Sequence, residues 1–286
     1  DKTGTLTAGE MTVVAMRVAD REYAVTGAGY SPDGQFTSGD DSATGSVPEH
    51  LMRALQIGAL CNRSSLSYNN DSWEVQGDPT EAALVVAAAK AGIDIAVLRQ
   101  DWRETAEIPF STERMLMATF HNHGGSSHVL VKGAPGRVIE LCTRILTADG
   151  VEKQLDDATR ERVLAWNRAM ASRGLRMLAL ADARTDKTGE QALNGITFVG
   201  LAGISDPPAE GVRQTIEILT GAGIRTVMLT GDQRLTAEAV ARDLGILRAG
   251  DRVLEGRDLD GLAPAQLVER ISTVTVLSRV TPETKL

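Results

Sequence analysis

The last third of the chain alternates short apolar runs with amphipathic segments, a pattern typical of strands followed by helices. The run ITFVGLAGI at 196–204 is rich in β-branched residues and predicts a buried strand. The segment 210–219 repeats apolar residues three and four positions apart, which predicts a helix. The other elements predicted here are strands at 225–231 and 273–278 and helices at 237–244 and 263–271. Repeated strand–helix units indicate a parallel sheet, and such sheets bind ligands at the carboxyl ends of their strands.

The region from about residue 10 to residue 186 lacks this regular alternation. Its strand-like runs lie at 11–18, 21–25, 115–122 and 127–133, and its predicted helices at 48–61, 79–90, 135–141 and 156–172. Strands that do not alternate regularly with helices predict an α+β domain on a mostly antiparallel sheet. The polar stretch SPDGQFTSGDDSATGS at 31–46 is expected to be a loop.

Composition restricts the class of protein. The chain has 286 residues, 42% of them hydrophobic and 24% charged, which is normal for a globular protein. The formal net charge of −8 argues against a general nucleic-acid binder. The two cysteines, Cys61 and Cys142, form no CxxC pair, so a reducing, intracellular setting is the simplest interpretation. No apolar run reaches the roughly 18 residues of a membrane span. Because the chain lacks an initiating Met, we expect a soluble piece of a longer protein.

Two polar segments at opposite ends of the chain are suited to holding phosphate. The chain opens DKTGTLT, in which Asp1 offers a carboxylate nucleophile and Lys2 a neutralising cation. Gly4 allows close approach of the backbone, and the threonines supply hydroxyl donors. The segment TGD at 230–232 follows a predicted strand, where phosphate-facing donors are expected. Each segment taken alone is also consistent with an ordinary polar terminus or turn.

These segments belong to an ordered set of motifs. In chain order the set is DKTGTLT at 1–7, GDPTE at 77–81, FSTERMLM at 110–117, KGAP at 132–135, GLRMLALA at 174–181, DPP at 206–208, TGD at 230–232 and SRVTPETK at 278–285. The set resembles the P-type cation-transporting ATPases, membrane pumps of the haloacid-dehalogenase superfamily. GDPTE and FSTER resemble the calcium, sodium and proton pump branches more than the heavy-metal branch.

The resemblance implies a discontinuous fold. Residues 1–9 and 205–286 would form part of a phosphorylation domain with a haloacid-dehalogenase-like parallel sheet. Residues 10–204 would form an inserted, mostly antiparallel α+β nucleotide-binding domain. The implied ligands are ATP and Mg²⁺. The implied partners are transmembrane and actuator domains of the same parent, which would lie in the cell membrane with this portion on the cytoplasmic side. The transported cation would bind elsewhere in the parent, and no nucleic-acid partner is implied.

The resemblance also assigns roles to residues. Asp1 would accept the γ-phosphate and, with Thr3, hold Mg²⁺. The groups around the phosphoryl group would be Lys2, Thr230, Gly231, Asp232 and Lys285, and Asp206 would belong to the hinge motif. The nucleotide-binding residues would be Glu81, Phe110, Lys132, Gly133, Arg176 and Asp206. Phe110 can stack on a purine. The residues themselves also give Glu81 a structural reading, because Asp78, Pro79 and Glu81 form a capping-box pattern at the start of a helix.

One position separates a pump from a phosphatase. Hydrolases of this superfamily usually carry a second Asp two residues after the nucleophile, where it protonates the leaving group. This chain has Thr3 there, which has no acid–base role near neutral pH. A phosphoenzyme would therefore persist until a conformational step admits water, as a pump requires.

Several features depart from the family pattern. Ala209 stands where the family usually has Arg after DPP, Met115 replaces the usual Lys after ER, and TGDQ replaces TGDN. Arg213 is a candidate to compensate for Ala209, and weak nucleotide affinity is expected. The GDGxND motif that completes the Mg²⁺ site does not occur, so we expect the fragment to be catalytically incomplete and to autophosphorylate inefficiently.

Two other functions stay open from the sequence. The fragment could act only as a nucleotide-binding module, or it could be a soluble phosphohydrolase of the haloacid-dehalogenase type with a large cap. Thr3, GDPTE and KGAP argue against the phosphohydrolase. His121, His123 and His128 lie near a predicted hairpin, but no Cys or paired acid completes a tetrahedral zinc set. The identity of the cation cannot be read from this portion.

Overall fold

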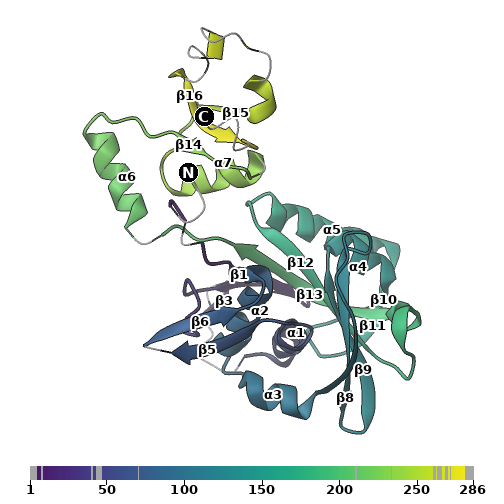
Figure 1. Cartoon of the computed structure of the whole chain (residues 1–286). Coiled ribbons are helices and arrows are strands. Elements are labelled where there is room, and N and C mark those ends of the chain that lie inside the picture. Colours follow the sequence, from purple (N-terminus) through teal and green to yellow (C-terminus); the bar gives the residue numbers. More distant parts are fainter. Residues whose placement is uncertain are drawn as a thin grey trace. The chain divides into compact units, whose positions relative to one another are not determined.

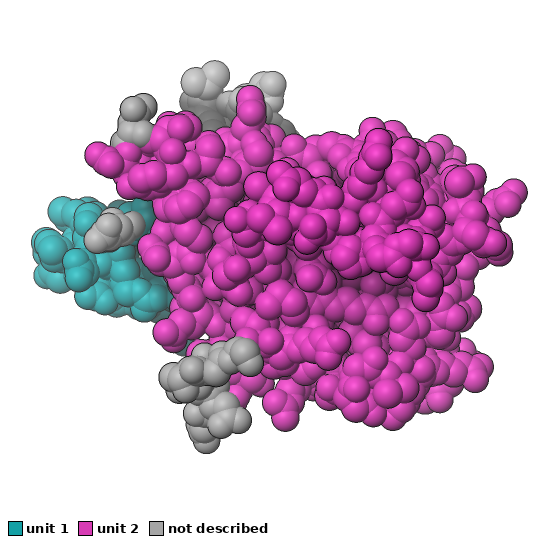
Figure 2. Space-filling view, turned by 90° about the horizontal axis from the view of Figure 1, so that it is seen from below, with its two compact units in different colours: residues 1–10, 172–175, 206–286 teal, residues 11–171, 176–205 magenta. Residues whose placement is uncertain are grey.

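A computed structural model gives the fold of the chain, and it describes residues 5–280 except 8, 40, 43–46, 70, 210, 233, 260–261, 263–265, 268–269 and 271. The chain forms two compact units, shown together in Figure 1 and coloured separately in Figure 2. Unit 1 comprises Asp1–Glu10, Ser172–Leu175 and Asp206–Leu286, and unit 2 comprises Met11–Ala171 and Arg176–Ser205. Among the described residues, no helix combines the length and the apolar character needed to cross a membrane.

A large sheet forms the centre of unit 2. Its strands are β1 (Thr12–Val18), β2 (Arg21–Val25), β3 (Phe36–Ser38), β4 (Asp41–Ser42), β7 (Arg103–Ile108), β8 (Leu116–His123), β9 (Ser126–Gly133), β10 (Cys142–Leu146), β11 (Glu152–Gln154), β12 (Arg176–Arg184) and β13 (Ile196–Ser205). The main path runs β4-β3-β2-β1-β13-β12-β9-β8-β7, and β10 and β11 branch from β13. The pairs are antiparallel except β10 with β13. The prediction of a mostly antiparallel sheet is confirmed.

Helices cover both faces of this sheet (Figure 1). They are α1 (Glu49–Leu60), α2 (Pro79–Lys90), α3 (Ile95–Asp101), α4 (Pro135–Leu141) and α5 (Asp157–Ala171), with a 3₁₀ turn at Gly189–Leu193. Leu130 of β9 and Leu180 of β12 belong to one core cluster with α1 and α2. Their neighbours Val129 and Val131 are also buried, and α4 and α5 contact the same sheet. Because successive strand residues point to opposite faces, β9 is buried on both sides.

The sequence prediction was wrong in two segments of unit 2. Residues 31–46 are not all loop, because β3 and β4 extend the sheet within them. Phe36 of β3 is buried. Its neighbours in the sequence are mostly polar, so the composition of the segment indicated a loop. The apolar run at 196–204 forms the buried strand β13, as predicted, but it pairs antiparallel with β1 and β12 and parallel with β10 in the sheet of unit 2, and it is not part of the parallel sheet of the last third. A strand buried on both faces has the same apolar pattern in either kind of sheet.

A two-stranded ribbon also belongs to unit 2 and was absent from the predictions. It consists of β5 (Ser65–Asn69) and β6 (Ser72–Gln76), which pair antiparallel. Tyr68 and Trp73 face each other across the ribbon with ring centroids 5.1 Å apart, and Tyr68 is 56% exposed. Since most residues of the ribbon are exposed, it lacks the apolar alternation that identifies a half-buried strand.

Unit 1 contains a smaller, parallel sheet. Its elements are α6 (Val212–Gly221), β14 (Met228–Leu229), α7 (Arg234–Asp243), β15 (Arg252–Glu255), the 3₁₀ turn Gly256–Leu259 and β16 (Val274–Ser278). The strand order is β14-β16-β15, and both pairs are parallel, as the strand–helix rhythm predicted. Ile216 is buried with Val212 and Leu219 packed around it, which confirms the predicted apolar face of α6. The helix predicted at 263–271 falls largely outside the described residues.

A buried ion pair ties α1 to the sheet of unit 2. Arg53 donates from Nε to Oδ2 of Asp182 over 2.8 Å and from Nη2 to Oδ1 over 2.6 Å. Arg53 also contacts Glu152, which accepts a bond from Thr197. Burial raises the pKa of Asp182 despite the opposing effect of Arg53. The carboxylate therefore depends on this arginine for its charge compensation.

Three histidines pack around one tryptophan where β8 and β9 form a hairpin. Trp102 stacks on His123 with centroids 4.3 Å apart, and it also contacts His128 and His121. His121 donates from Nδ1 to the Trp102 carbonyl, 3.1 Å away, and its Nε2 accepts from the Thr119 hydroxyl, 2.8 Å away. These partners favour a neutral imidazole. Burial lowers the pKa of His121 and of His128.

We predict that Arg53→Met lowers the free energy of unfolding by about 3 kcal/mol, because it leaves the Asp182 carboxylate buried without its cation. Arg53→Lys keeps the charge but not the bidentate geometry, so its loss should be smaller. Urea denaturation at pH 7 measures both. An Arg53→Met protein as stable as wild type would show that the ion pair does not hold α1 on the sheet.

We also predict that stability falls as the pH drops below about 6.5, the unfolded pKa of histidine. The folded-state pKa of His121 and of His128 lies lower, so between the two values the unfolded chain binds more protons. The stabilising contribution of the two neutral histidines is complete above about pH 6.5 and is lost as the pH falls through their folded-state pKa values. Urea titrations at pH 7.5, 6.5 and 5.5 measure the slope, and His121→Gln/His128→Gln should reduce it. An unchanged slope in that variant would contradict the assignment.

Candidate functional site

A cavity of about 550 Å³ opens in unit 2 where five separate segments meet. It is lined by Asp78, Thr80, Glu81, Phe110, Met115, Met117, Lys132, Gly133, Ala134, Arg176, Met177 and Leu178. These residues come from the start of α2, the turn after β7, β8, the end of β9 with the residue that follows it, and the start of β12. Five of the six residues that the sequence singled out for nucleotide binding therefore line one cavity. The sixth, Asp206, belongs to unit 1 and is not among the lining residues. The volume of the cavity lies in the range of small-molecule sites.

The first turn of α2 presents Glu81 to the cavity. Asp78 is the N-cap, and its side chain accepts from the backbone N–H groups of Thr80 and Glu81. Pro79 occupies the first helical position, as predicted. The reciprocal half of the capping box was predicted wrongly. Glu81 turns away from the N-cap because Arg63 N–H and Lys132 Nζ each bond its carboxylate over 2.7 Å.

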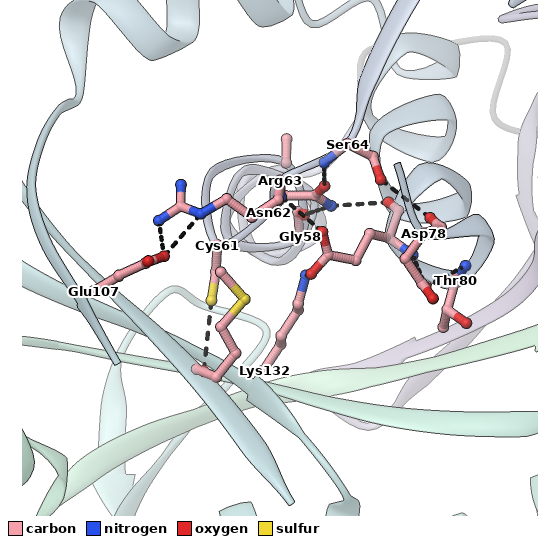
Figure 3. Close-up of polar contacts among 12 residues, drawn as sticks. Gly58, Cys61, Asn62, Arg63, Ser64, Asp78, Thr80, Glu107 and Lys132 are labelled. Carbon is pink, nitrogen blue, oxygen red and sulfur yellow. Dashed lines mark hydrogen bonds and ion pairs between the residues drawn. The ribbon is translucent and has the colours of Figure 1, made fainter. Parts of the chain in front are cut away.

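Lys132 stands at the end of β9, and only 7% of its side chain is exposed. Figure 3 shows Lys132 reaching from the sheet toward the start of α2. Its Nζ donates there to the Glu81 carboxylate. Gly133, the next residue, passes close to β8, since a Cβ there would lie 2.6 Å from the Met115 carbonyl oxygen and from the Leu116 Cβ. A larger residue at position 133 would separate the two strands and displace Lys132.

Phe110 and Arg176 lie on other walls of the same cavity. The Phe110 ring is 60% exposed, an unusual position for a large apolar side chain and one that leaves a π-face open. Arg176, the first residue of β12, donates from Nη1 to the Thr80 hydroxyl over 2.9 Å. The cavity thus combines an exposed aromatic ring with two cations, Lys132 and Arg176. Lys132 is paired with the Glu81 carboxylate, whereas Arg176 bonds a hydroxyl.

The segment Asn62–Ser64 supports this wall and was not singled out from the sequence. The Asn62 side chain donates to the carbonyls of Gly58 and Glu81, and it accepts from Ser64 N–H. Ser64 donates to the Asp78 carbonyl. Figure 3 shows these bonds joining the end of α1 to the start of α2. The network fixes the backbone on which Glu81 is carried.

Arg63 joins the same corner to β7. Its guanidinium forms ion pairs with Glu104 and Glu107, the latter drawn in Figure 3. The hydrogen bond from Arg63 lowers the pKa of Glu104. Glu107 lies three residues before Phe110. Arg63 therefore connects β7, which leads to the Phe110 ring, with Glu81, whose carboxylate accepts the Arg63 backbone N–H. Nothing in the local sequence signals these contacts, since the partners lie 18 to 44 positions away.

Both thiols of the chain are free and buried. Cys61 lies below the network and donates to the Met117 carbonyl over 3.6 Å. Burial raises the pKa of Cys61, and it raises the pKa of Cys142 to about 12. Protonated, buried thiols are poor nucleophiles, so neither is a candidate catalytic group.

In unit 1, the predicted TGD segment follows β14 at the carboxyl edge of the parallel sheet. Thr230 is buried, its N–H donates to the Leu277 carbonyl, and its hydroxyl accepts from Asp232 N–H over 3.1 Å. The Asp232 carbonyl accepts from Arg279 N–H. These bonds join the loop of Thr230, Gly231 and Asp232 to the end of β16, at the edge where such sheets hold ligands.

Asp206 joins two distant segments of unit 1. Its carboxylate accepts from the Thr7 hydroxyl over 2.6 Å and from Gly9 N–H over 2.9 Å. Thr7 and Pro208 also form an isolated antiparallel bridge. Arg213 pairs with Asp243 over 2.5 Å, so its described partner is an acid on α7. The predicted residues Asp1, Lys2, Thr3 and Lys285 lie outside the described residues, and so does their expected approach to Thr230.

Comparisons with known proteins agree with this picture. The family described as "P-type ATPase, cytoplasmic domain N" matches residues 50–211. The chain is 37% identical to a calcium-transporting ATPase of Bacillus subtilis, 40% identical to a probable cation-transporting ATPase F of Mycobacterium bovis, and 35% identical to a bovine calcium-transporting ATPase type 2C member 1. Each match covers 100% of this chain but only 33%, 32% and 29% of the relative. The chain thus spans about a third of the length of these curated relatives. Because the family match covers more than half of the chain, the chain belongs to the P-type ATPase family, of which it carries the cytoplasmic domain N.

Proposed function

We propose that unit 2 binds ATP in the 550 Å³ cavity, chiefly through its adenosine part. The observation that carries the proposal is the gathering of Glu81, Phe110, Lys132, Gly133 and Arg176 around one cavity. These residues come from four motifs that are far apart in the sequence. An exposed ring suits the face of a purine, and the cations suit the negative end of a nucleotide.

Different residues of the cavity wall recognise different parts of the nucleotide. Phe110 stacks on the base, and Gly133 lets the ligand approach the backbone at the end of β9. Lys132, held by Glu81, offers its remaining donor hydrogens to ligand oxygens. Arg176 can exchange its bond to the Thr80 hydroxyl for a stronger, charge-assisted bond to a phosphate. None of these steps requires the core of unit 2 to repack.

Unit 1 supplies the chemistry in this proposal. The Asp1 carboxylate attacks the γ-phosphorus of ATP, the bond to the β,γ-bridging oxygen breaks, and ADP leaves with that oxygen. Lys2, Thr230, Gly231, Asp232 and Lys285 surround the transferred phosphoryl group. Asp1 and Thr3 would hold Mg²⁺, which supplies charge neutralisation on the phosphate oxygens. Thr3 provides no acid for rapid hydrolysis of the aspartyl-phosphate. Asp206, in the hinge motif at 206–208, is held by the bonds that it accepts from Thr7 and Gly9.

The domain arrangement follows from the same proposal. Residues 1–9 and 205–286 are part of a haloacid-dehalogenase-like phosphorylation domain, and residues 10–204 are the domain inserted into it. The parent is an ATP-driven, cation-translocating pump of the cell membrane, with this portion on the cytoplasmic side. Relatives named as calcium- and cation-transporting ATPases support that assignment. The transmembrane and actuator parts of such a parent are the partners of this portion.

We predict that the full 286-residue chain binds ATP and that Phe110→Ala weakens the affinity about tenfold. Loss of one base–aromatic stack costs about 1 kcal/mol or more. Isothermal titration calorimetry with ATP measures the dissociation constants. Tyr68→Ala is the matched control, because it also removes a ring that is about half exposed, but from the β5–β6 ribbon instead of the cavity.

Equal ATP affinities for wild type and Phe110→Ala would show that ATP does not bind in this cavity. Equal losses in Phe110→Ala and Tyr68→Ala would point to a general effect of deleting an exposed ring. Absence of any binding heat in the titration with ATP at millimolar concentration would reject nucleotide binding by unit 2 altogether.

A further inference from the structure

A second cavity, of about 480 Å³, opens in unit 2 at the other ends of β9 and β12. Lys132 and Arg176 line the first cavity, whereas His128 of β9 and Asp182 of β12 line the second. Arg176 and Asp182 are six positions apart on one extended strand, which corresponds to about 20 Å. The two cavities share no lining residue. They are therefore separate places on one sheet.

The charges in the wall of the second cavity are compensated. Arg53 bonds both Asp182 and Glu152, and a second arginine also pairs with Glu152. Two arginines thus offset two carboxylates. The remaining charged residues of the wall, Glu49 and Arg184, have opposite signs, and both are exposed. Because these charges cancel, the wall selects neither an anion nor a cation.

Several polar groups of the same wall are open to a ligand. Among the described residues, none forms a hydrogen bond with the ring nitrogens of His128 or with the carboxamide of Gln56. Burial lowers the pKa of His128, so its neutral ring offers one donor and one acceptor. The Gln56 carboxamide also offers both kinds of group. The ion pairs of Arg53 use Nε and Nη2, so Nη1 can still donate.

The apolar part of the wall differs from that of the first cavity. Trp102 already stacks on His123 with ring centroids 4.3 Å apart, and it also packs on the main core cluster. Phe110 in the first cavity, by contrast, is 60% exposed. A flat heterocycle is therefore less well matched to the second cavity. The C–H groups of a puckered ring can pack on the edge of Trp102 and on the side chains of Met52 and Leu146.

We propose that the second cavity binds an uncharged, hydroxyl-rich ligand, namely a sugar of one or two rings. Every sugar hydroxyl both donates and accepts a hydrogen bond, which matches the open groups of His128, Gln56 and Arg53. The absence of net charge in the ligand matches the compensated wall. The volume of about 480 Å³ lies in the range of small-molecule sites. This site does not depend on nucleotide binding in the first cavity.

The first test follows saturation transfer from the full chain to sugars by ligand-observed NMR, at sugar concentrations up to about 20 mM. The probes are glucose, maltose, glucosamine and glucuronate, of which the last two keep the ring but carry a positive and a negative charge. We expect glucose and maltose to bind with dissociation constants of about 1 to 10 mM, as suits small ligands held mainly by hydrogen bonds. The charged analogues should bind no more than about threefold tighter than glucose.

Two outcomes of this test contradict the proposal. Absence of saturation transfer to both glucose and maltose would show that the cavity does not bind sugars. Binding of glucosamine or glucuronate more than about threefold tighter than glucose would show that the wall selects an ion.

The second test locates the ligand in the molecule. Gln56→Met and His128→Phe retain a side chain of similar shape but remove its hydrogen-bonding groups, so each should weaken glucose binding about threefold to tenfold. Gln100→Met is the matched control, because Gln100 is exposed on α3 and does not line the cavity. Phe110→Ala alters the first cavity only and should also leave glucose binding unchanged. Urea denaturation identifies the variants that are folded.

Unchanged glucose affinity in the folded Gln56→Met and His128→Phe variants would overturn the site. A loss in Phe110→Ala as large as the loss in these variants would assign the sugar to the first cavity and would overturn it too. The calorimetric titration with ATP tests the first cavity by itself, so the two proposals can fail independently.

Discussion

The candidate site depends on one ion pair between segments that are distant in the sequence. Glu81 and Lys132 lie 51 positions apart, and their charged atoms meet at 2.7 Å with side-chain exposures of 17% and 7%. Neither charge could be withdrawn from water to this degree alone, because desolvating a single ion costs several kcal/mol. The Glu81 carboxylate also accepts the backbone N–H of Arg63, so one carboxylate joins α2, β9 and the segment that follows α1. The position of the cavity follows from this constraint.

Much of unit 2 could be predicted because its burial leaves a clear sequence pattern. Helix α2 begins where Asp78 and Pro79 place its cap, and the apolar runs of β8 and β9 mark the centre of the sheet. The ribbon of β5 and β6 could not be predicted, because its residues are mostly exposed and their pairing does not depend on an apolar face. The strand direction of β13 was also hidden, since a strand covered on both sides shows the same apolar run in either orientation.

Five residues of the cavity wall were named from the sequence, whereas the contacts that connect them were not. Resemblance to a family pointed to Glu81, Phe110, Lys132, Gly133 and Arg176, which line the cavity, and to Asp206, which does not. The support by Asn62 and Arg63 was not identified, because polar residues after a helix normally indicate a loop. The capping pattern predicted one partner for Glu81, whereas tertiary contacts gave it two others. Local rules fail where a long-range charge competes for the same carboxylate.

The first cavity, with two acids and two cations in its wall, is physically consistent with a nucleotide domain that does not perform the chemistry. A site that gripped the triphosphate with many cations would hold the phosphates where they could not react, and it would stabilise the ground state rather than the transition state. The proposed stacking on Phe110 instead holds the part of the ligand that stays unchanged during phosphoryl transfer. On the proposals made above, the phosphoryl group that is transferred is surrounded by the Thr230–Gly231–Asp232 loop and its partners in unit 1. Affinity for the nucleotide and stabilisation of the transferred phosphoryl group can then be adjusted independently, since they reside on different residues of different units.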